Sequence, residues 1–133
     1  MPLLYQPPVG SVVMCQFDGI APEMVKVRPA IILARNRQNN QLVTVVPIST
    51  TAPKPAMPYH HQLTVNPVPP KPGQPVPLCW AKCDMVETVA LHRLDRIKDG
   101  KNPDGSRRYV VPLLPAADIA AVQAGVKLAL GLP

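Results

Sequence analysis

Several motifs that accompany metal-dependent or nucleotide-driven chemistry are missing from this sequence. It has no glycine-rich phosphate-binding loop, no nucleophile elbow, no HExxH pair and no cluster of carboxylates that would hold magnesium. These absences argue against nucleotide-driven and metal-dependent enzymes, and we expect neither a metal ion nor another cofactor.

Long apolar runs are missing as well. No stretch approaches the roughly 20 apolar residues of a membrane span. The first ten residues, MPLLYQPPVG, have no basic region followed by an apolar core, as a secretory signal would. We therefore expect a cytoplasmic protein that makes no contact with a membrane.

Cysteine is scarce, and the three present, Cys15, Cys79 and Cys83, are an odd number without framework spacing, which indicates reduced thiols. A zinc site from Cys79 and Cys83 with His60 or His61 is conceivable. In an extended segment, however, four residues span roughly 13 Å, too far for two thiolates to share one ion.

Acidic residues are outnumbered by basic ones, 8 to 14, which gives a formal net charge of +6. A basic balance favours an anionic partner such as nucleic acid, although charge alone describes binding rather than fold. The length fits one domain, 1–133, which can bury about two thirds of its unfolded surface.

Proline is the residue in excess: 19 of 133 residues, where roughly 5% is usual. Most of the excess lies in two segments, 52–58 and 66–77. Fixed φ angles and missing donors predict loops of polyproline character there. A ligand motif for a proline-reading domain is one interpretation; a stiffened loop between strands is the simpler one.

Alternating and β-branched runs predict strands in six segments, whereas no helical period occurs before residue 115. In the first run, Val13, Cys15 and Phe17 share one face. The segment KDGKNPDGS is a turn signal that precedes the last strand. The predicted strands are 10–18, 28–34, 41–48, 61–65, 77–91 and 107–113.

Residues 116–130 predict one terminal helix. Apolar residues recur there at intervals of three and four, Asp118 suits the first turn, Lys127 the last turn and Gly131 the stop. Gly125 inside the helix costs about 1 kcal/mol against alanine, which a close backbone approach would explain. The predicted architecture is mainly β: a small, strongly curved antiparallel sheet or barrel with a C-terminal helix packed on it.

Candidate chemical groups lie at strand ends. Arg28 is always charged yet precedes a proline and an apolar run, so it either extends into water or faces an anion. If 77–91 is one strand, Lys82 and Asp84 project from the same face. They could form an exposed ion pair worth under about 1 kcal/mol, or a functional pair.

Other polar residues are ambiguous by themselves. Hydroxyl groups of Ser49, Thr50 and Thr51 follow a strand, where they commonly close turns but could also donate to phosphate. The adjacent histidines His60 and His61 point opposite ways on a strand, so at most one should face a site. Five basic residues share one hairpin that is either solvated or in contact with a nucleic-acid backbone: Arg96, Lys98, Lys101, Arg107 and Arg108.

Together these arginine, lysine, aspartate, serine and histidine side chains could support metal-free attack on a phosphodiester by a neighbouring hydroxyl group. RNA carries that hydroxyl as its 2′-OH, and DNA does not.

The order of the segments resembles the MazF/PemK (Kid) family of bacterial toxins over nearly the whole chain. The resemblance implies an SH3-like barrel that acts as a homodimeric, metal-independent endoribonuclease on single-stranded RNA and is neutralised by a cognate antitoxin. Its matching segments are GSVVMCQFDG, KVRPAIIL, VVPISTTAP, WAKCDMVETVALHRLDRI and AADIAAVQAGVKLALGL.

By that resemblance Arg28 matches the catalytic arginine of the RP motif, Ser49 a Thr or Ser after the third strand, and Asp84 a proposed general base. Lys82, the candidate general acid, stands where PemK-like members have arginine, and lysine is a point donor whereas arginine is a fixed fork. The RNA-binding candidates are Thr50, Thr51, His60, His61, Arg107 and Arg108. The proline-rich loop, 66–77, looks like an insertion relative to the family.

Two rival functions share this architecture. A CcdB-like gyrase-binding toxin would act through protein binding and would not need Arg28, Lys82 and Asp84 together. A homologue without turnover would bind RNA or antitoxin and cut nothing.

Overall fold

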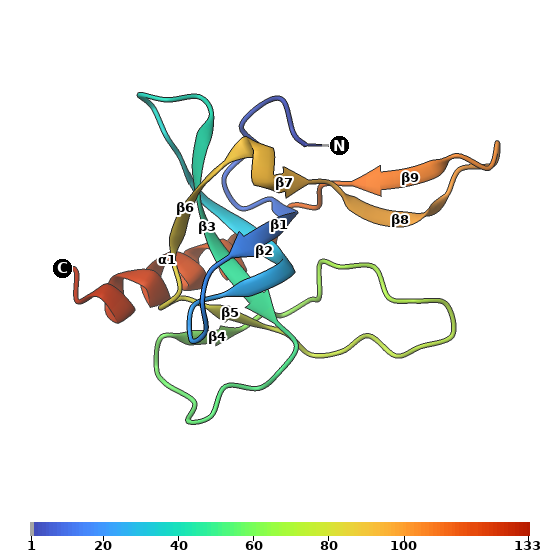
Figure 1. The fold of residues 1–133 in the computed structure, drawn as a ribbon. Coiled ribbons are helices and arrows are strands. Elements are labelled where there is room, and N and C mark those ends of the chain that lie inside the picture. The colour runs from blue at the N-terminus through green and yellow to red at the C-terminus, as the bar shows by residue number, and fades with distance from the viewer. Residues whose placement is uncertain (1) are drawn as a thin grey trace.

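The fold was analysed in a computed structural model that describes residues 2–133. A curved antiparallel sheet carries one helix on its side, and a β-hairpin and a long loop extend from it (Figure 1). The elements are β1 (Val12–Asp18), β2 (Val25–Arg35), β3 (Leu42–Ser49), β4 (His60–Gln62), β5 (Trp80–Lys82), β6 (Glu87–Ala90), the 3₁₀ turn η1 (Leu91–Arg93), β7 (Leu94–Asp95), β8 (Ile97–Lys101), β9 (Arg107–Val110) and α1 (Ala116–Leu130).

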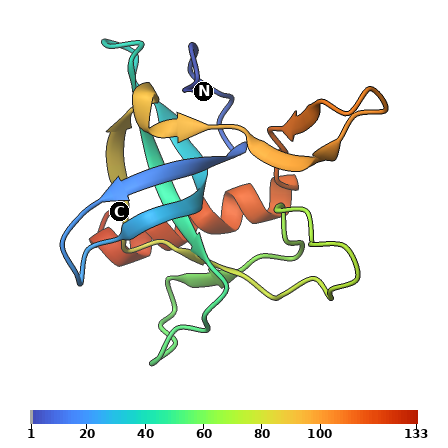
Figure 2. The same ribbon diagram turned by 45° about the vertical axis from the view of Figure 1, so that its right-hand side comes forward.

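The main sheet has the order β4-β5-β3-β2-β1-β7, and β6 also pairs with β3. Its two outermost strands, β4 and β7, are not paired with each other, so the sheet is strongly curved but not closed. β8 and β9 form a separate hairpin. The prediction of a mainly β architecture with a C-terminal helix is confirmed (Figures 1 and 2).

Alternation along the central strands produces two apolar clusters. Val12 and Ile31 belong to the cluster that includes Val122 and Val126 of α1. Val13 and its strand neighbours Cys15 and Phe17 belong to the other cluster, enclosed by the curved sheet. The predicted face of β1 is therefore confirmed, because successive side chains of a strand point to opposite sides.

The helix begins and ends where the sequence predicts. Gly131 follows it with φ of 68°, the left-handed conformation that favours glycine at a helix end. Gly125 lies against the sheet: a Cβ atom there would come within 2.8 Å of both Cys83 Sγ and the Tyr59 carbonyl oxygen. A close backbone approach therefore explains the glycine, since any side chain would push the helix away from β4 and β5.

The prediction of one continuous strand over 77–91 is wrong. β5 ends at Lys82, a turn follows in which the Met85 amide donates to the Lys82 carbonyl oxygen at 3.0 Å, and β6 begins at Glu87. β5 pairs with β3 at Ile48 and β6 pairs with it at Val45, so the turn faces Val46 and Pro47. Proline has no N–H to donate to a neighbouring strand, which accounts for the break in pairing at this point.

The strand predicted at 61–65 is shorter and shifted. β4 covers His60–Gln62, and the chain turns away at Thr64. The Thr64 amide and hydroxyl group donate instead to the Asp118 carboxylate, the hydroxyl group at 2.7 Å. The Asp118 carboxylate on α1 thus replaces the backbone acceptors of a neighbouring strand that a longer β4 would have used.

All three cysteines are buried free thiols. Burial raises the pKa of Cys15 to about 12 and that of Cys83 to about 11. These thiols therefore stay protonated and serve as small apolar groups of the core. No helix of the described chain is long and apolar enough to cross a membrane.

Candidate functional site

Arg28 lies near the start of β2, paired with Cys15 of β1. Its Nε donates to the Val25 carbonyl oxygen at 3.2 Å, which fixes the base of the guanidinium group. No carboxylate of the described residues lies within ion-pair distance of it. The start of β2 therefore presents an uncompensated positive charge to solvent, as an anion site requires.

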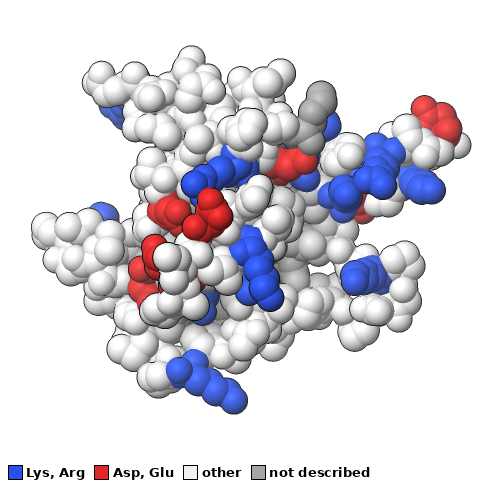
Figure 3. Space-filling model, viewed as in Figure 1, with Lys and Arg blue, Asp and Glu red and all other residues white. Residues whose placement is uncertain are grey.

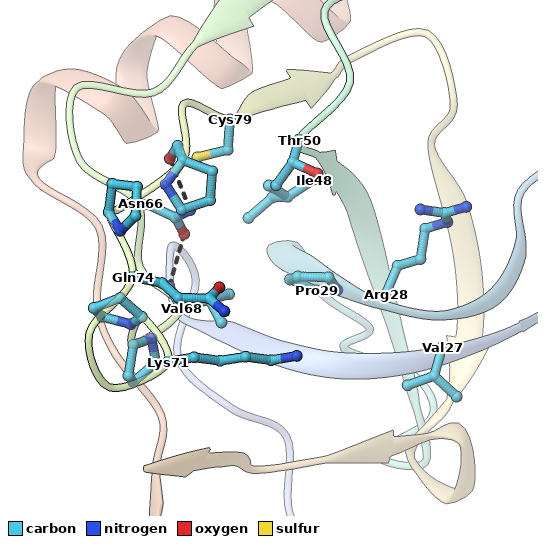
Figure 4. Close-up of a pocket in the computed structure, with 14 residues that line it drawn as sticks. Val27, Arg28, Pro29, Ile48, Thr50, Asn66, Val68, Lys71, Gln74 and Cys79 are labelled. Carbon is cyan, nitrogen blue, oxygen red and sulfur yellow. Dashed lines mark hydrogen bonds between the residues drawn. The ribbon is translucent and has the colours of Figure 1, made fainter. Parts of the chain in front are cut away.

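A cavity of about 270 Å³ adjoins Arg28 and is enclosed on its far side by the proline-rich loop 66–77 (Figure 4). Ile48, Pro29 and Cys79 line its apolar interior. Thr50 also lines it, so the structure brings the predicted residues Arg28 and Thr50 to one cavity.

Ser49 closes a local turn. Its side chain is buried, its hydroxyl oxygen accepts the Thr51 amide at 3.1 Å, and the hydroxyl group faces the Thr51 carbonyl oxygen at 3.4 Å. This is the turn-forming arrangement that the sequence left open for these hydroxyl groups.

A second hollow is lined by Lys82, Asp84, His60 and Lys54. The His60 Nε2 lies 3.7 Å from Asp84 Oδ1. The Met57 amide donates to His60 Nδ1 at 3.1 Å, so Nε2 is the nitrogen that carries the proton. The His60 ring is 9% exposed and the Asp84 side chain 38%, so the hollow combines a buried imidazole with an open carboxylate.

The expectation that Lys82 and Asp84 share one face of a strand is wrong, because Asp84 lies in the turn after β5. The two residues still line the same hollow, but Asp84 lies beside His60, with Oδ1 3.7 Å from Nε2, and forms no ion pair with Lys82 among the described residues. Arg28 lies in the other hollow. The segment that follows β3 separates the two, since Thr50 lines the first and Pro53 the second.

His61 points to the opposite side of β4, toward α1. Its Nε2 lies 2.8 Å from Asp118 Oδ1, and the Asp118 side chain is 1% exposed. Burial would raise the pKa of Asp118, but hydrogen bonds from Thr64 and His61 outweigh that effect and hold the pKa below its ordinary value. His61 thus ties β4 to the first turn of the helix.

The β8–β9 hairpin carries a concentration of basic side chains that extends away from the sheet (Figure 3). Arg108 is more than half exposed and lies 3.6 Å from Asp99, and Arg107 is exposed near the tip. The Arg96 guanidinium lies 4.4 Å from the centroid of the Tyr109 ring, a cation–π contact that stiffens the arm.

Sequence reasoning treated the proline-rich loop as a spacer and missed the polar side chains that line the cavity. They are Asn66, Lys71 and Gln74. The available signal was the occurrence of these residues among prolines, where a stiffened backbone holds side chains in place.

Comparison with known proteins places this geometry in a family. Residues 9–130 match the family described as PemK-like, MazF-like toxin of type II toxin-antitoxin system. The protein YifN of Escherichia coli (strain K12) is 28% identical over 145 residues, covering 95% of this chain and 93% of its own.

Solved structures share the fold. The Mycobacterium tuberculosis toxin MazF-mt6 is 23% identical with a TM-score of 0.61, over 92% of this chain and 98% of that chain. An endoribonuclease from Mycobacterial species, solved in complex with its cognate antitoxin, is 19% identical with a TM-score of 0.61, over 96% and 98%. The match over 9–130 covers every strand and the helix, and the chain therefore belongs to the PemK-like, MazF-like toxin family of type II toxin-antitoxin systems.

Proposed function

We propose that this protein is a toxin endoribonuclease that cleaves single-stranded RNA without a metal ion, and that a cognate antitoxin neutralises it. The observation that carries the proposal is Arg28, which has no carboxylate partner among the described residues and lines one cavity with Thr50, in a chain of this toxin family. The mycobacterial relative solved with its antitoxin supports the second part.

The proposed reaction is an internal transfer. The 2′-oxygen of RNA attacks the adjacent phosphorus, the bond from phosphorus to the 5′-oxygen breaks, and a 2′,3′-cyclic phosphate and a 5′-hydroxyl group remain. Arg28 stabilises the negative charge that develops on the phosphate. Asp84 takes the proton of the 2′-OH, and the 5′-oxygen receives one from His60 Nε2 or Lys82.

The two hollows set a condition on the bound RNA. Because the segment from Thr50 to Pro53 separates them, the RNA backbone must lie across that segment to contact Arg28 and Asp84 together. Ser49 and Thr51 then act by shaping the turn, rather than through a free serine hydroxyl group.

We also propose a homodimer. Several apolar side chains at the end of α1 are more than half exposed, which leaves surface for a second copy or for the antitoxin: Leu128, Leu130 and Leu132. Light scattering that shows only a monomer at tens of micromolar would contradict the dimer.

Purified protein incubated with a long single-stranded RNA in EDTA should produce fragments with 2′,3′-cyclic phosphate ends. The same sequence made as DNA should stay intact, because it lacks the 2′-OH. Gel mapping of the ends and mass spectrometry of the products provide the measurement. Activity that disappears with chelator and returns with magnesium would contradict the proposed chemistry, and RNA binding without cutting would indicate a homologue without turnover.

Replacing Arg107 and Arg108 together by alanine should weaken RNA binding in proportion to the charge removed. Each phosphate contact on a single strand contributes about 0.7 to the slope of log affinity against log salt concentration, so the slope should fall by about 1.4. Binding isotherms at several salt concentrations measure it. An unchanged slope would show that the hairpin does not contact the RNA backbone.

A further inference from the structure

The cavity beside Arg28 is closed by a loop whose conformation is fixed. The Asn66 side chain donates to the Pro77 carbonyl oxygen at 3.1 Å and accepts the Val68 amide at 2.9 Å, which ties the two ends of the loop together. The Gln74 amide donates to the Lys71 carbonyl oxygen at 3.1 Å. With the prolines that fix φ between these bonds, the wall of the cavity is formed before a ligand binds.

The interior is apolar and the rim is polar. Ile48, Val68 and Cys79 are among the apolar residues inside. Figure 4 shows the Gln74 amide directed into the space and the Lys71 side chain extending across it toward Pro29. Neither Gln74 nor Lys71 uses its side-chain polar group in a hydrogen bond or ion pair with the described residues.

The size and chemistry of this space suit one planar heterocycle. A volume of about 270 Å³ is just below the roughly 300–1,000 Å³ of sites for drug-sized molecules. A carboxamide offers a donor and an acceptor side by side, the pattern that reads base edges. Apolar walls take the faces of an unstacked base, which is how single-stranded RNA is commonly recognised.

The charged residues around the cavity indicate what is attached to the heterocycle. Arg28 lies at the end of the cavity away from the loop, with its guanidinium pointing outward, and Lys71 lies on the loop side (Figure 4). None of the residues that line the cavity is acidic. A base inside the cavity would thus have its own backbone phosphate near a cation, as a nucleotide requires.

We propose that this cavity binds one nucleobase of the RNA, next to the phosphate that Arg28 contacts, and that the Gln74 carboxamide selects which base is accepted. The proposal rests on the endoribonuclease function proposed above. On this proposal the proline-rich loop, 66–77, determines which RNA sequence is cleaved and is more than a spacer between strands.

Cleavage of a randomised single-stranded RNA pool, followed by sequencing of the new ends, tests the selection. The parent protein should favour one base at a fixed position beside the cut. In Gln74→Ala that preference should relax by at least about fivefold. Val76→Ala is the matched control, because Val76 is an exposed residue of the same loop outside the cavity; its preference should be unchanged.

A second measurement does not depend on cleavage. A pool of 2′-O-methyl RNA tetramers, whose 2′-oxygen cannot attack, is titrated into methyl-labelled protein and followed by NMR. The Ile48 and Val68 methyl signals should shift, whereas those of Val43, buried in the other cluster, should not. Shifts without cleavage of ordinary RNA would support base binding and contradict the endoribonuclease.

The nucleobase site would be overturned if the parent and a folded Gln74→Ala protein cleaved with the same base preference and the Ile48 and Val68 signals did not shift. The proposed endoribonuclease function would remain intact. Thermal melts of each variant confirm that it is folded; Gln74 is exposed, so its truncation removes no core contact.

Discussion

Arg28→Ala should slow RNA cleavage by at least about a hundredfold in a protein that remains folded. The guanidinium has one fixed bond, from Nε to the Val25 carbonyl oxygen, and no carboxylate partner among the described residues, so its remaining donors are available to an anion. Removing one such electrostatic contact to a transition state typically costs about 3 kcal/mol. Single-turnover cleavage with saturating RNA gives the rate, and a thermal melt gives the stability.

Arg35→Ala is the matched control for this change. Arg35 is an exposed arginine at the other end of the same strand, so the variant loses the same charge from β2 and leaves the Arg28 cavity intact. Its rate should stay within a few-fold of the parent. Equal losses in the two variants would show that net charge matters rather than position, and would remove Arg28 from the proposed mechanism.

The parts of the fold that depend on local pattern could be predicted from the sequence. Alternation placed Val13, Cys15 and Phe17 on one face of β1, and the spacing of apolar residues with Gly131 at the end placed the helix at 116–130. Each of these features needs only the period of a strand or helix and a terminal residue with special backbone freedom.

Features that depend on partners far along the chain could not be predicted. The strand break after Lys82 faces Pro47, which lies 35 positions earlier, and the shift of β4 follows from the bonds that Thr64 makes to Asp118 across 54 positions. Sequence shows that each residue is present but not which segment will lie opposite it.

The residues of the candidate site stay a prediction, and the sequence could not show how they are arranged. Residue types at strand ends indicated Arg28, Asp84 and His60, yet no local pattern could show that Arg28 and Asp84 lie in two hollows on either side of the segment after β3. Likewise, the sequence indicated that at most one of the adjacent histidines faces a site, but not which one. Only the packing of α1 assigns His61 to a buried carboxylate and leaves His60 beside the exposed Asp84.

The position of Asp84 beside His60 leads to the second prediction with a large expected effect. In Asp84→Asn, single-turnover cleavage should fall by at least about a hundredfold, the low end of the contribution of a positioned base. Stability should change by less than about 1 kcal/mol, because the side chain is 38% exposed and faces a single histidine at 3.7 Å. RNA binding should persist or tighten, since a negative charge leaves a hollow that also contains Lys54 and Lys82.

Asp99→Asn removes the same charge from a comparable setting. Asp99 is 33% exposed and lies 3.6 Å from Arg108 in the β8–β9 hairpin, outside both hollows. With saturating RNA its cleavage rate should stay within a few-fold of the parent. A folded Asp84→Asn protein that cleaves as fast as Asp99→Asn would eliminate Asp84 as the base.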